Sequence, residues 1–354
     1  MNFDLLKRLC ETPGISGSED PIRKLAAAEM RPLVDTLEAD SMGSVIGIKE
    51  GKSGGPRVMI AAHIDEIGFR VRHIDDKGFI RIAPVGGWDP RNLMAQRVFV
   101  HGFSSQSLRG ALGTSAKPKH LMSPEDANKS PKIEEFYVDL GLPGEKVKEL
   151  VEVGDMITMD RTTEQIGDMV LSKTLDDRLG VFIMIEALRK LQGKDITATV
   201  LAVATTQEEV GLRGAVPAAY ALNPDIGIAL DVTIAFDIPG SADADRITTL
   251  GGGAAIKISD SSLICHPKLV RHFRDIAKAK DITHQLEILP AGGTDAGGIQ
   301  RSRGGVPSIT LSIPTRYIHS VNEMAHLEDI QATIDLLAAY LEEAHTGDYK
   351  FVLE

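Results

Sequence analysis

Histidine and carboxylate side chains follow several apolar, strand-like runs of this sequence, at the point where each run ends. The runs are 57–62, 196–204, 226–230 and 308–313, and the residues that follow them are His63 and Asp65, Glu208 and Glu209, Asp231, and His319. Two further carboxylates, Asp176 and Asp177, lie in a turn just before a helical pattern. Because ligands bind outside the carboxyl ends of the strands in an open α/β sheet, we expect these side chains to converge.

Converging histidines and carboxylates in an acidic chain with few cysteines indicate a site for divalent metal ions. Two histidines and three carboxylates are too many for one tetrahedral zinc ion that keeps an open position. They suit two ions, with one carboxylate bridging them. Two ions held about 4 Å apart polarise a carbonyl group and activate a water molecule between them.

The stretch TTQEEVG, residues 205–211, places two glutamates side by side where a strand-like run stops. Consecutive side chains leaving a strand point to different sides, so one glutamate can bind metal while the other stays free as a general base. His63 and Asp65 are two residues apart and face the same way. Asp65 can therefore hydrogen-bond the far ring nitrogen of His63 and orient the ring.

Each signal also has an ordinary structural explanation when it is taken alone. Two adjacent glutamates, taken by themselves, usually lie on the solvated surface. Asp231 alone could cap the turn after it. An Asp-Asp pair before a helix commonly supplies an N-cap and a first-turn acid, which would account for Asp177. The recurrence of such residues at several strand ends and turns favours the metal site.

The composition excludes several classes of function. The chain has 354 residues and a net charge of −11, from 39 basic and 50 acidic residues, which argues against nucleic acid and against anionic membranes as partners. Its two cysteines, Cys10 and Cys265, form no disulfide framework, so we expect a reducing cytoplasm. The N-terminus lacks a signal-peptide pattern, and no apolar run reaches the roughly 18 residues of a membrane span.

The elements that must position these residues alternate between helix and strand on both sides of a different middle section. Residues 1–67 and 167–354 predict one discontinuous α/β domain with an open, largely parallel, doubly wound sheet. Residues 68–166 contain short alternating segments separated by Gly and Pro turns, which is typical of a small β-barrel. The barrel is therefore predicted to be inserted into the α/β domain.

Six motifs together carry a resemblance to a known family. They are AHIDEIG (62–68), LDDRLG (175–180), QEEVGLRGA (207–215), ALDVT (229–233), GGTDAGG (292–298) and RYIHS (316–320). In this order, and over essentially the whole chain, they resemble the M42 family of dinuclear metallo-aminopeptidases, which includes glutamyl aminopeptidases and tetrahedral aminopeptidases. The predicted β insertion is similar to the barrel-like dimerisation domain of that family.

The resemblance implies a role for each residue and two divalent ions per subunit, zinc or cobalt in the first place and manganese as a further option. His63 and Asp231 would bind one ion, Glu209 and His319 the other, and Asp176 would bridge them through a segment whose Asp176–Asp177 peptide bond is cis. Glu208 would be the general base and Asp65 the partner of His63. The glycine-rich stretch 290–298 would form the wall of the substrate pocket, with Gly293, Thr294 and Asp295 near the substrate.

The activity implied is removal of N-terminal residues from short peptides by dimers that assemble into a tetrahedral dodecamer. A metal-dependent carboxypeptidase or deacylase is the main alternative, and it would prefer a free carboxylate on its substrate. A glycosidase needs two carboxylates but no histidine cluster, and a non-enzymatic peptide-binding shell needs no base. Which N-terminal residue is removed stays open, because an acidic one needs a cation and the candidates are Arg213, Arg301, Arg303 and Arg316.

Overall fold

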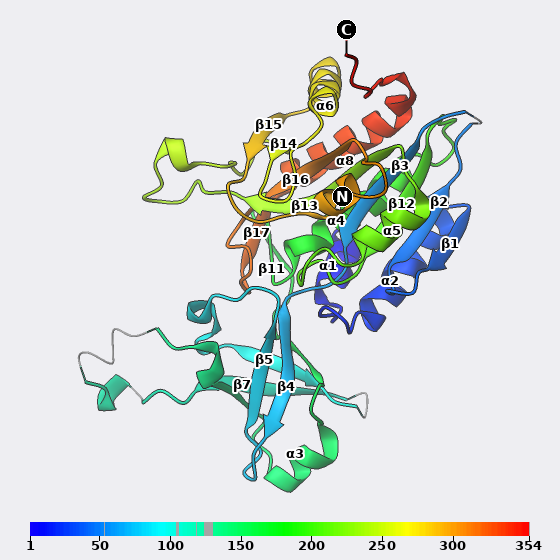
Figure 1. The fold of residues 1–354 in the computed structure, drawn as a ribbon. Helices are drawn as coiled ribbons and strands as arrows, with labels where there is room; N and C mark the ends of the chain where they lie inside the picture. Colours follow the sequence, from blue (N-terminus) through cyan, green and yellow to red (C-terminus); the bar gives the residue numbers. More distant parts are fainter. Residues whose placement is uncertain (53, 104–105, 118, 124–129, 354) are drawn as a thin grey trace.

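The parallel strands at the centre of the main sheet are apolar along nearly their whole length. The computed structural model describes residues 1–52, 54–103, 106–117, 119–123 and 130–353, and within these an eleven-stranded sheet forms the larger part of the molecule (Figure 1). Its central strands, in spatial order and mutually parallel, are β12 (Thr199–Thr205), β3 (Arg57–His63), β13 (Ile226–Ile234) and β16 (Ser308–Arg316). The parallel pairing brings their carboxyl ends to one edge.

Antiparallel strands flank this centre. Beside β12 lie β2 (Val45–Lys49) and β1 (Thr36–Ala39); beside β16 lie β17 (Glu323–His326), β11 (Met169–Ser172) and β10 (Glu164–Ile166); β14 (Ala254–Ser259) also pairs with β16, and with β15 (His284–Ile288). The expected α/β sheet is therefore confirmed, with its parallel character confined to the centre and to the β14–β15 pair.

Helices cover both faces of the sheet, as the two-sided burial of the central strands requires. Along β3, Val58, Ile60 and Ala62 pack into one apolar cluster, while Met59 and Ala61 pack into another on the opposite face. The first cluster is completed by α1 (Phe3–Glu11), α2 (Asp20–Met30), α4 (Leu175–Lys190), α6 (Pro267–Ala279) and α8 (Leu327–Glu343), and the second by α5 (Ala215–Leu222) and α7 (Asp295–Gln300).

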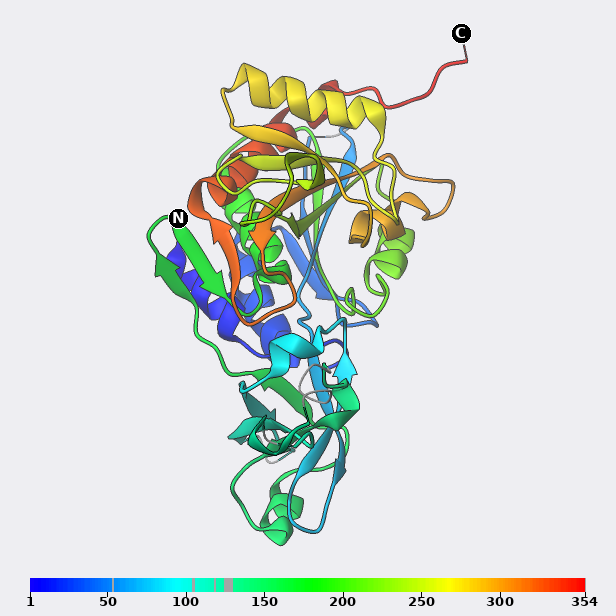
Figure 2. The same cartoon turned by 90° about the vertical axis from the view of Figure 1, so that its left-hand side faces the viewer.

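The middle section forms a closed antiparallel barrel, as its alternating pattern predicted. In spatial order its strands are β4 (Gly68–Ile74), β5 (Ile80–Val85), β8 (Phe136–Asp139), β7 (Ser107–Thr114), β6 (Arg97–His101) and β9 (Met156–Met159). The short helix α3 (Gly144–Leu150) packs beside it. Figure 2 shows the barrel as a separate lobe below the sheet. The division at residues 67–68 and 166–167 remains a prediction; the barrel strands lie within it, while β10 (Glu164–Ile166) precedes its second boundary and pairs in the main sheet.

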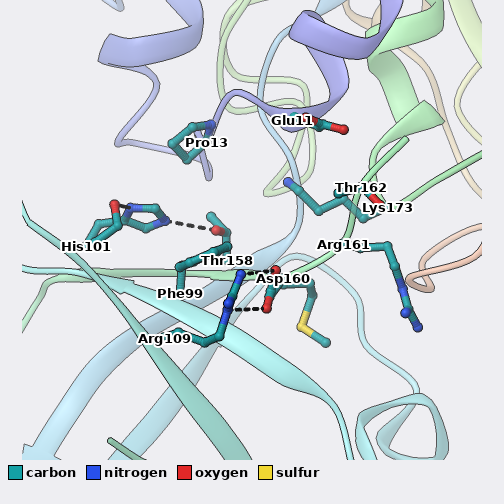
Figure 3. Close-up of a pocket in the computed structure, with 12 residues that line it drawn as sticks. Glu11, Pro13, Phe99, His101, Arg109, Thr158, Asp160, Arg161, Thr162 and Lys173 are labelled. Atoms are coloured by element: carbon teal, nitrogen blue, oxygen red, sulfur yellow. Dashed lines mark hydrogen bonds and ion pairs between the residues drawn. The ribbon is translucent and has the colours of Figure 1, made fainter. Parts of the chain in front are cut away.

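A pocket of about 340 Å³ marks the place where the two lobes meet (Figure 3). Glu11, Pro13 and Lys173 line it from the sheet side, and the barrel supplies His101 among others. The ring of His101 is held between Ser107 Oγ and Thr158 Oγ1, each at 2.9 Å, and burial lowers its pKa to about 4. On the barrel side the joint therefore combines a histidine held by neutral hydrogen bonds with an ion pair, Arg109 Nε to Asp160 Oδ2 at 2.7 Å.

Buried charges lie behind this joint. Glu66, which directly precedes the barrel, pairs with Lys173 Nζ and lies 3.7 Å from the guanidinium of Arg178. A buried charge is stable only when it is paired in this way.

In the described part of the chain, no helix has both the length and the apolarity to cross a membrane.

Candidate metal centre

The carboxyl edge of the parallel strands gathers the five predicted metal ligands and the predicted base. The residues and their positions are His63 at the end of β3, Glu208 and Glu209 in the turn after β12, Asp231 within β13, Asp176 at the start of α4, and His319 between β16 and β17. All of them line one cavity of about 960 Å³. Segments more than 250 residues apart in sequence therefore meet, because the sheet aligns their ends.

Two groups of potential metal ligands overlap at one carboxylate. His63, Asp176 and Asp231 form the first group and Asp176, Glu209 and His319 the second, and within each group the ligand atoms lie within 4.8 Å of one another. The two oxygens of Asp176 face different histidines: Oδ1 lies 3.1 Å from His63 Nε2, and Oδ2 lies 3.3 Å from His319 Nε2. This is the arrangement expected of a bridging carboxylate.

The donor set fits divalent cations. Glu209 Oε1 is buried and has no hydrogen-bond partner among the residues that the structure describes. Burial and the repulsion of nearby carboxylates raise the pKa of Glu209, and they raise the pKa of Asp231 well above its ordinary value. Cations bound between these groups would pair with the buried oxygen and offset the repulsion between the carboxylates. Imidazole and carboxylate ligands also suit zinc and related ions.

The carboxylates around the two histidines favour positive charge on both imidazole rings. Burial would lower the pKa of His319, but the carboxylates of Asp176 and Glu209 outweigh it and raise this pKa to about 12. The pKa of His63 is likewise raised against burial, chiefly by Asp176 and Asp65. The carboxylates therefore favour positive charge at the point where a cation would bind.

Glu208 belongs to neither ligand group. Its Oε2 lies 3.9 Å from His63 Nε2, and it lines the same cavity. Burial and the charges of Asp231 and Asp295 raise its pKa well above the ordinary value, although His63 acts in the opposite direction. A buried carboxylate next to a metal centre, but not needed as a ligand, has the properties of a general base.

The carboxylate of Asp65 makes different hydrogen bonds from the one to the His63 ring that the sequence predicted. The far nitrogen of His63, Nδ1, donates to the backbone carbonyl of Asp65 at 3.0 Å and lies 3.6 Å from its carboxylate. That carboxylate accepts hydrogen bonds from Ser16 Oγ at 2.6 Å, from Glu208 N at 3.0 Å and from Glu209 N at 3.2 Å. Since these donors occupy the carboxylate, Asp65 fixes the backbone of both glutamates as well as orienting the histidine.

A sequence model of the family described as M42 glutamyl aminopeptidase matches residues 43–336. The chain belongs to the M42 family. The lysyl aminopeptidase of Pyrococcus furiosus is 36% identical over 358 residues, which cover 99% of each chain. The structure of an aminopeptidase from the archaeon Desulfurococcus kamchatkensis superposes with a TM-score of 0.93 at 40% identity, covering 99% of this chain and 98% of that one.

A third relative is a peptidase of Pyrococcus horikoshii, described as able to assemble into a tetrahedron or a large octahedral shell. It has a TM-score of 0.86 at 31% identity, and the match covers 96% of this chain and 99% of that one. Membership of the M42 family makes the chain a metal-dependent aminopeptidase, that is, a hydrolase of peptide bonds. The resemblance stated from the motifs is thereby confirmed.

The start of α4 in this M42 enzyme contains the cis peptide bond Asp176–Asp177 that was expected. Asp177 is fully buried, and its carboxylate accepts hydrogen bonds from Gly180 N at 3.0 Å and from His63 N at 3.1 Å. The first contact is the helix-capping role that the sequence allowed. The second ties the start of the helix to the backbone of a candidate ligand.

Glu323 is a residue of the M42 site that the sequence reasoning missed. Its side chain is buried, and its two carboxylate oxygens accept hydrogen bonds from the backbone of two candidate ligands, Asp176 and His319. It follows His319 by four residues, just beyond the motif RYIHS. The available signal was weak: a glutamate at the start of the short strand EMAH (323–326), where a buried ionisable group calls for a partner.

The three residues expected near the substrate lie at different depths. Gly293 lines the cavity, whereas Thr294 and Asp295 are buried behind it and are not among the lining residues. Thr294 is hydrogen-bonded to Thr310 Oγ1 at 2.8 Å, and Asp295 accepts a hydrogen bond from Thr205. Their contacts indicate support of the wall, and direct contact with substrate stays a prediction.

Proposed function

We propose that the enzyme releases N-terminal residues from short peptides with two divalent ions per subunit. His63 and Asp231 would hold one ion, Glu209 and His319 the other, and Asp176 would bridge them. The single observation that carries this proposal is the overlap of two ligand groups at Asp176. When bound, ions at these positions would polarise the scissile carbonyl and acidify a water molecule.

Glu208 would move the proton. Its carboxylate takes a proton from the attacking water and passes it to the nitrogen of the leaving amine, which departs as the peptide bond breaks. Burial of Glu208 supports this role, because it raises the pKa of the carboxyl well above its ordinary value, and a less acidic carboxyl accepts a proton more readily. Asp65 would keep Glu208 in place through the backbone hydrogen bond at 3.0 Å.

The experiment for this function uses protein that has been stripped of metal and then reloaded with zinc, cobalt or manganese. Calorimetric titration should give two ions per subunit, and aminoacyl-p-nitroanilides with a free amine should be cleaved, whereas N-acetylated ones should not. Release of the C-terminal residue from an N-acetylated peptide would favour a carboxypeptidase or deacylase. Chelator-resistant cleavage of a glucan would favour a glycosidase. Binding of peptides without any cleavage would leave only a peptide-binding shell.

Self-association into dimers and then into a tetrahedral dodecamer is part of the same proposal. The relative from Pyrococcus horikoshii, described as assembling into a tetrahedron or an octahedral shell, supports it. Native mass spectrometry would distinguish a dimer from a dodecamer. We further propose a cytoplasmic enzyme, which both buried, unpaired cysteines support, and one without nucleic acid or membrane partners, which the net charge of −11 supports.

A further inference from the structure

The cavity that contains the candidate metal centre has an apolar wall beside its charged floor. Side chains that contribute apolar surface include Leu212, Val232, Ile234, Phe236, Leu289 and Ile318. Two of them remain substantially exposed, Ile234 at 41% and Phe236 at 37%. Large apolar side chains left open to solvent around a cavity mark a surface that an apolar ligand covers.

An acidic side chain in this cavity would meet little positive charge. Apart from the two histidines of the metal centre, Arg91 is the one cationic side chain among the described lining residues. It is 74% exposed, and its guanidinium already makes a two-pronged contact with Asp89, at 2.9 Å and 2.5 Å. An ion pair between so exposed a guanidinium and an acidic side chain of a substrate would contribute little to binding.

The arginines that the sequence left open as acid-binding candidates are not lining residues of the cavity. Arg316 forms a bidentate pair with Asp237 at 2.5 Å and 2.7 Å. Arg301 donates to the Gly297 carbonyl at 2.8 Å, and Arg303 lies over the ring of Tyr220. Their guanidinium groups are therefore occupied by the protein itself, and Arg213 stays outside the cavity.

A basic side chain of a substrate would find no carboxylate free to pair with it among the described lining residues. The carboxylates among the described lining residues are Asp176, Glu208, Glu209 and Asp231. The proposed function uses each of them, either as a metal ligand or as the base. A lysine or arginine directed at any of the four would displace the catalytic arrangement.

We propose that the enzyme prefers an uncharged, apolar residue such as leucine or methionine at the N-terminus of its substrate. This inference rests on the proposed aminopeptidase function and adds the class of residue that it removes. It sets this chain apart from the lysyl aminopeptidase of Pyrococcus furiosus, to which it is 36% identical. Burial of a leucine-sized side chain against such a wall favours it by roughly thirtyfold over a side chain that stays in solvent.

The test compares leucyl, methionyl, glutamyl and lysyl p-nitroanilides on the metal-loaded enzyme. We expect kcat/KM for the leucyl and methionyl substrates to exceed that for the two charged ones by about tenfold or more. A preference for the lysyl or glutamyl substrate would overturn this inference and leave the aminopeptidase function standing. No cleavage of any of the four would overturn the function and the inference together.

Two variants connect the preference to the wall. Phe236→Ala should lower kcat/KM for the leucyl substrate about fivefold to tenfold and change the two charged substrates little. Phe351→Ala is the matched control, because Phe351 is 73% exposed and lies outside the cavity. Arg91→Ala should leave the ratio of leucyl to glutamyl turnover within about twofold. A selective loss of glutamyl turnover in Arg91→Ala would instead assign acid recognition to Arg91 and contradict the inference.

Discussion

Glu323 binds the backbone of Asp176 and of a second candidate ligand with one carboxylate. Its Oε2 accepts the Asp176 N–H at 3.0 Å, and its Oε1 accepts the His319 N–H at 2.9 Å. Burial and the nearby charge of Asp176 raise the pKa of Glu323 well above the usual range. The structure retains this costly buried group where it connects the start of α4 to the loop between β16 and β17.

Replacement of Glu323 by Gln should weaken metal binding without unfolding the protein. The amide directs an N–H group at one of the two backbone N–H donors, so Asp176 or His319 loses its fixed position. Loss of a residue that orients metal ligands typically costs about 10-fold to 100-fold in affinity. Calorimetric titration of the stripped variant measures this. The exposed neighbour Glu328, changed to Gln, is the control, and equal affinities in the two variants would remove the positioning role.

Replacement of Glu208 by Gln should reduce turnover severely and spare the metal. Loss of a general base lowers kcat by about 10²-fold to 10⁴-fold, while KM and the number of bound ions stay near the wild-type values, because Glu208 is in neither ligand group. Steady-state kinetics and elemental analysis of the same sample give both quantities. Comparable turnover at full metal occupancy would exclude Glu208 as the base.

Metal uptake should strengthen as the pH rises and should release protons. The metal-free protein has raised pKa values at Asp231 and Glu209, whose carboxyls must ionise before they bind a cation. His319, with a pKa raised to about 12, and His63, also raised, must lose a proton as well. All four shifts act in the same direction. Titrations in buffers with different ionisation enthalpies count the protons, and an affinity independent of pH between 6 and about 8 would contradict this expectation.

Asp231→Asn should stabilise the metal-free protein while it impairs the first ion site. The raised pKa of Asp231 means that the folded state binds this proton more tightly than the unfolded chain does. The contribution to stability is present at low pH and is lost as the pH rises from the ordinary value of 3.8 toward the raised one. At neutral pH the neutral amide avoids that loss, worth about 1 kcal/mol in the free energy of unfolding.

Urea denaturation in the presence of chelator measures the effect of Asp231→Asn. The midpoint should exceed that of the wild type without metal and fall below it when metal is added. Asp195→Asn provides a control, since the side chain of Asp195 is 89% exposed and pairs with Lys52. A metal-free variant that is no more stable than the wild type would show that the buried charge at position 231 costs the fold nothing.

Some parts of this architecture could be predicted from the sequence and others could not, for physical reasons. The central strands were predictable because residues such as Ile60 and Val203 are buried on both faces of the sheet, which leaves unbroken apolar runs. The direction of the edge strands was not, because an alternating pattern fits either pairing. The roles of Glu323 and of the Asp65 carboxylate were also hidden, because each depends on contacts between a side chain and a backbone group more than 140 residues away.

The loop of His319 rests on the inserted barrel. Val321, two residues further along the chain, is 3% exposed and belongs to the apolar core of that barrel. A side chain at Gly87, which follows β5, would come within 3.4 Å of the His319 ring. The barrel and the sheet therefore both position the imidazole ring of His319. A rotation of one lobe against the other would move a candidate ligand of the second ion. The relative orientation of the barrel and the sheet therefore determines whether the second metal site has its correct geometry.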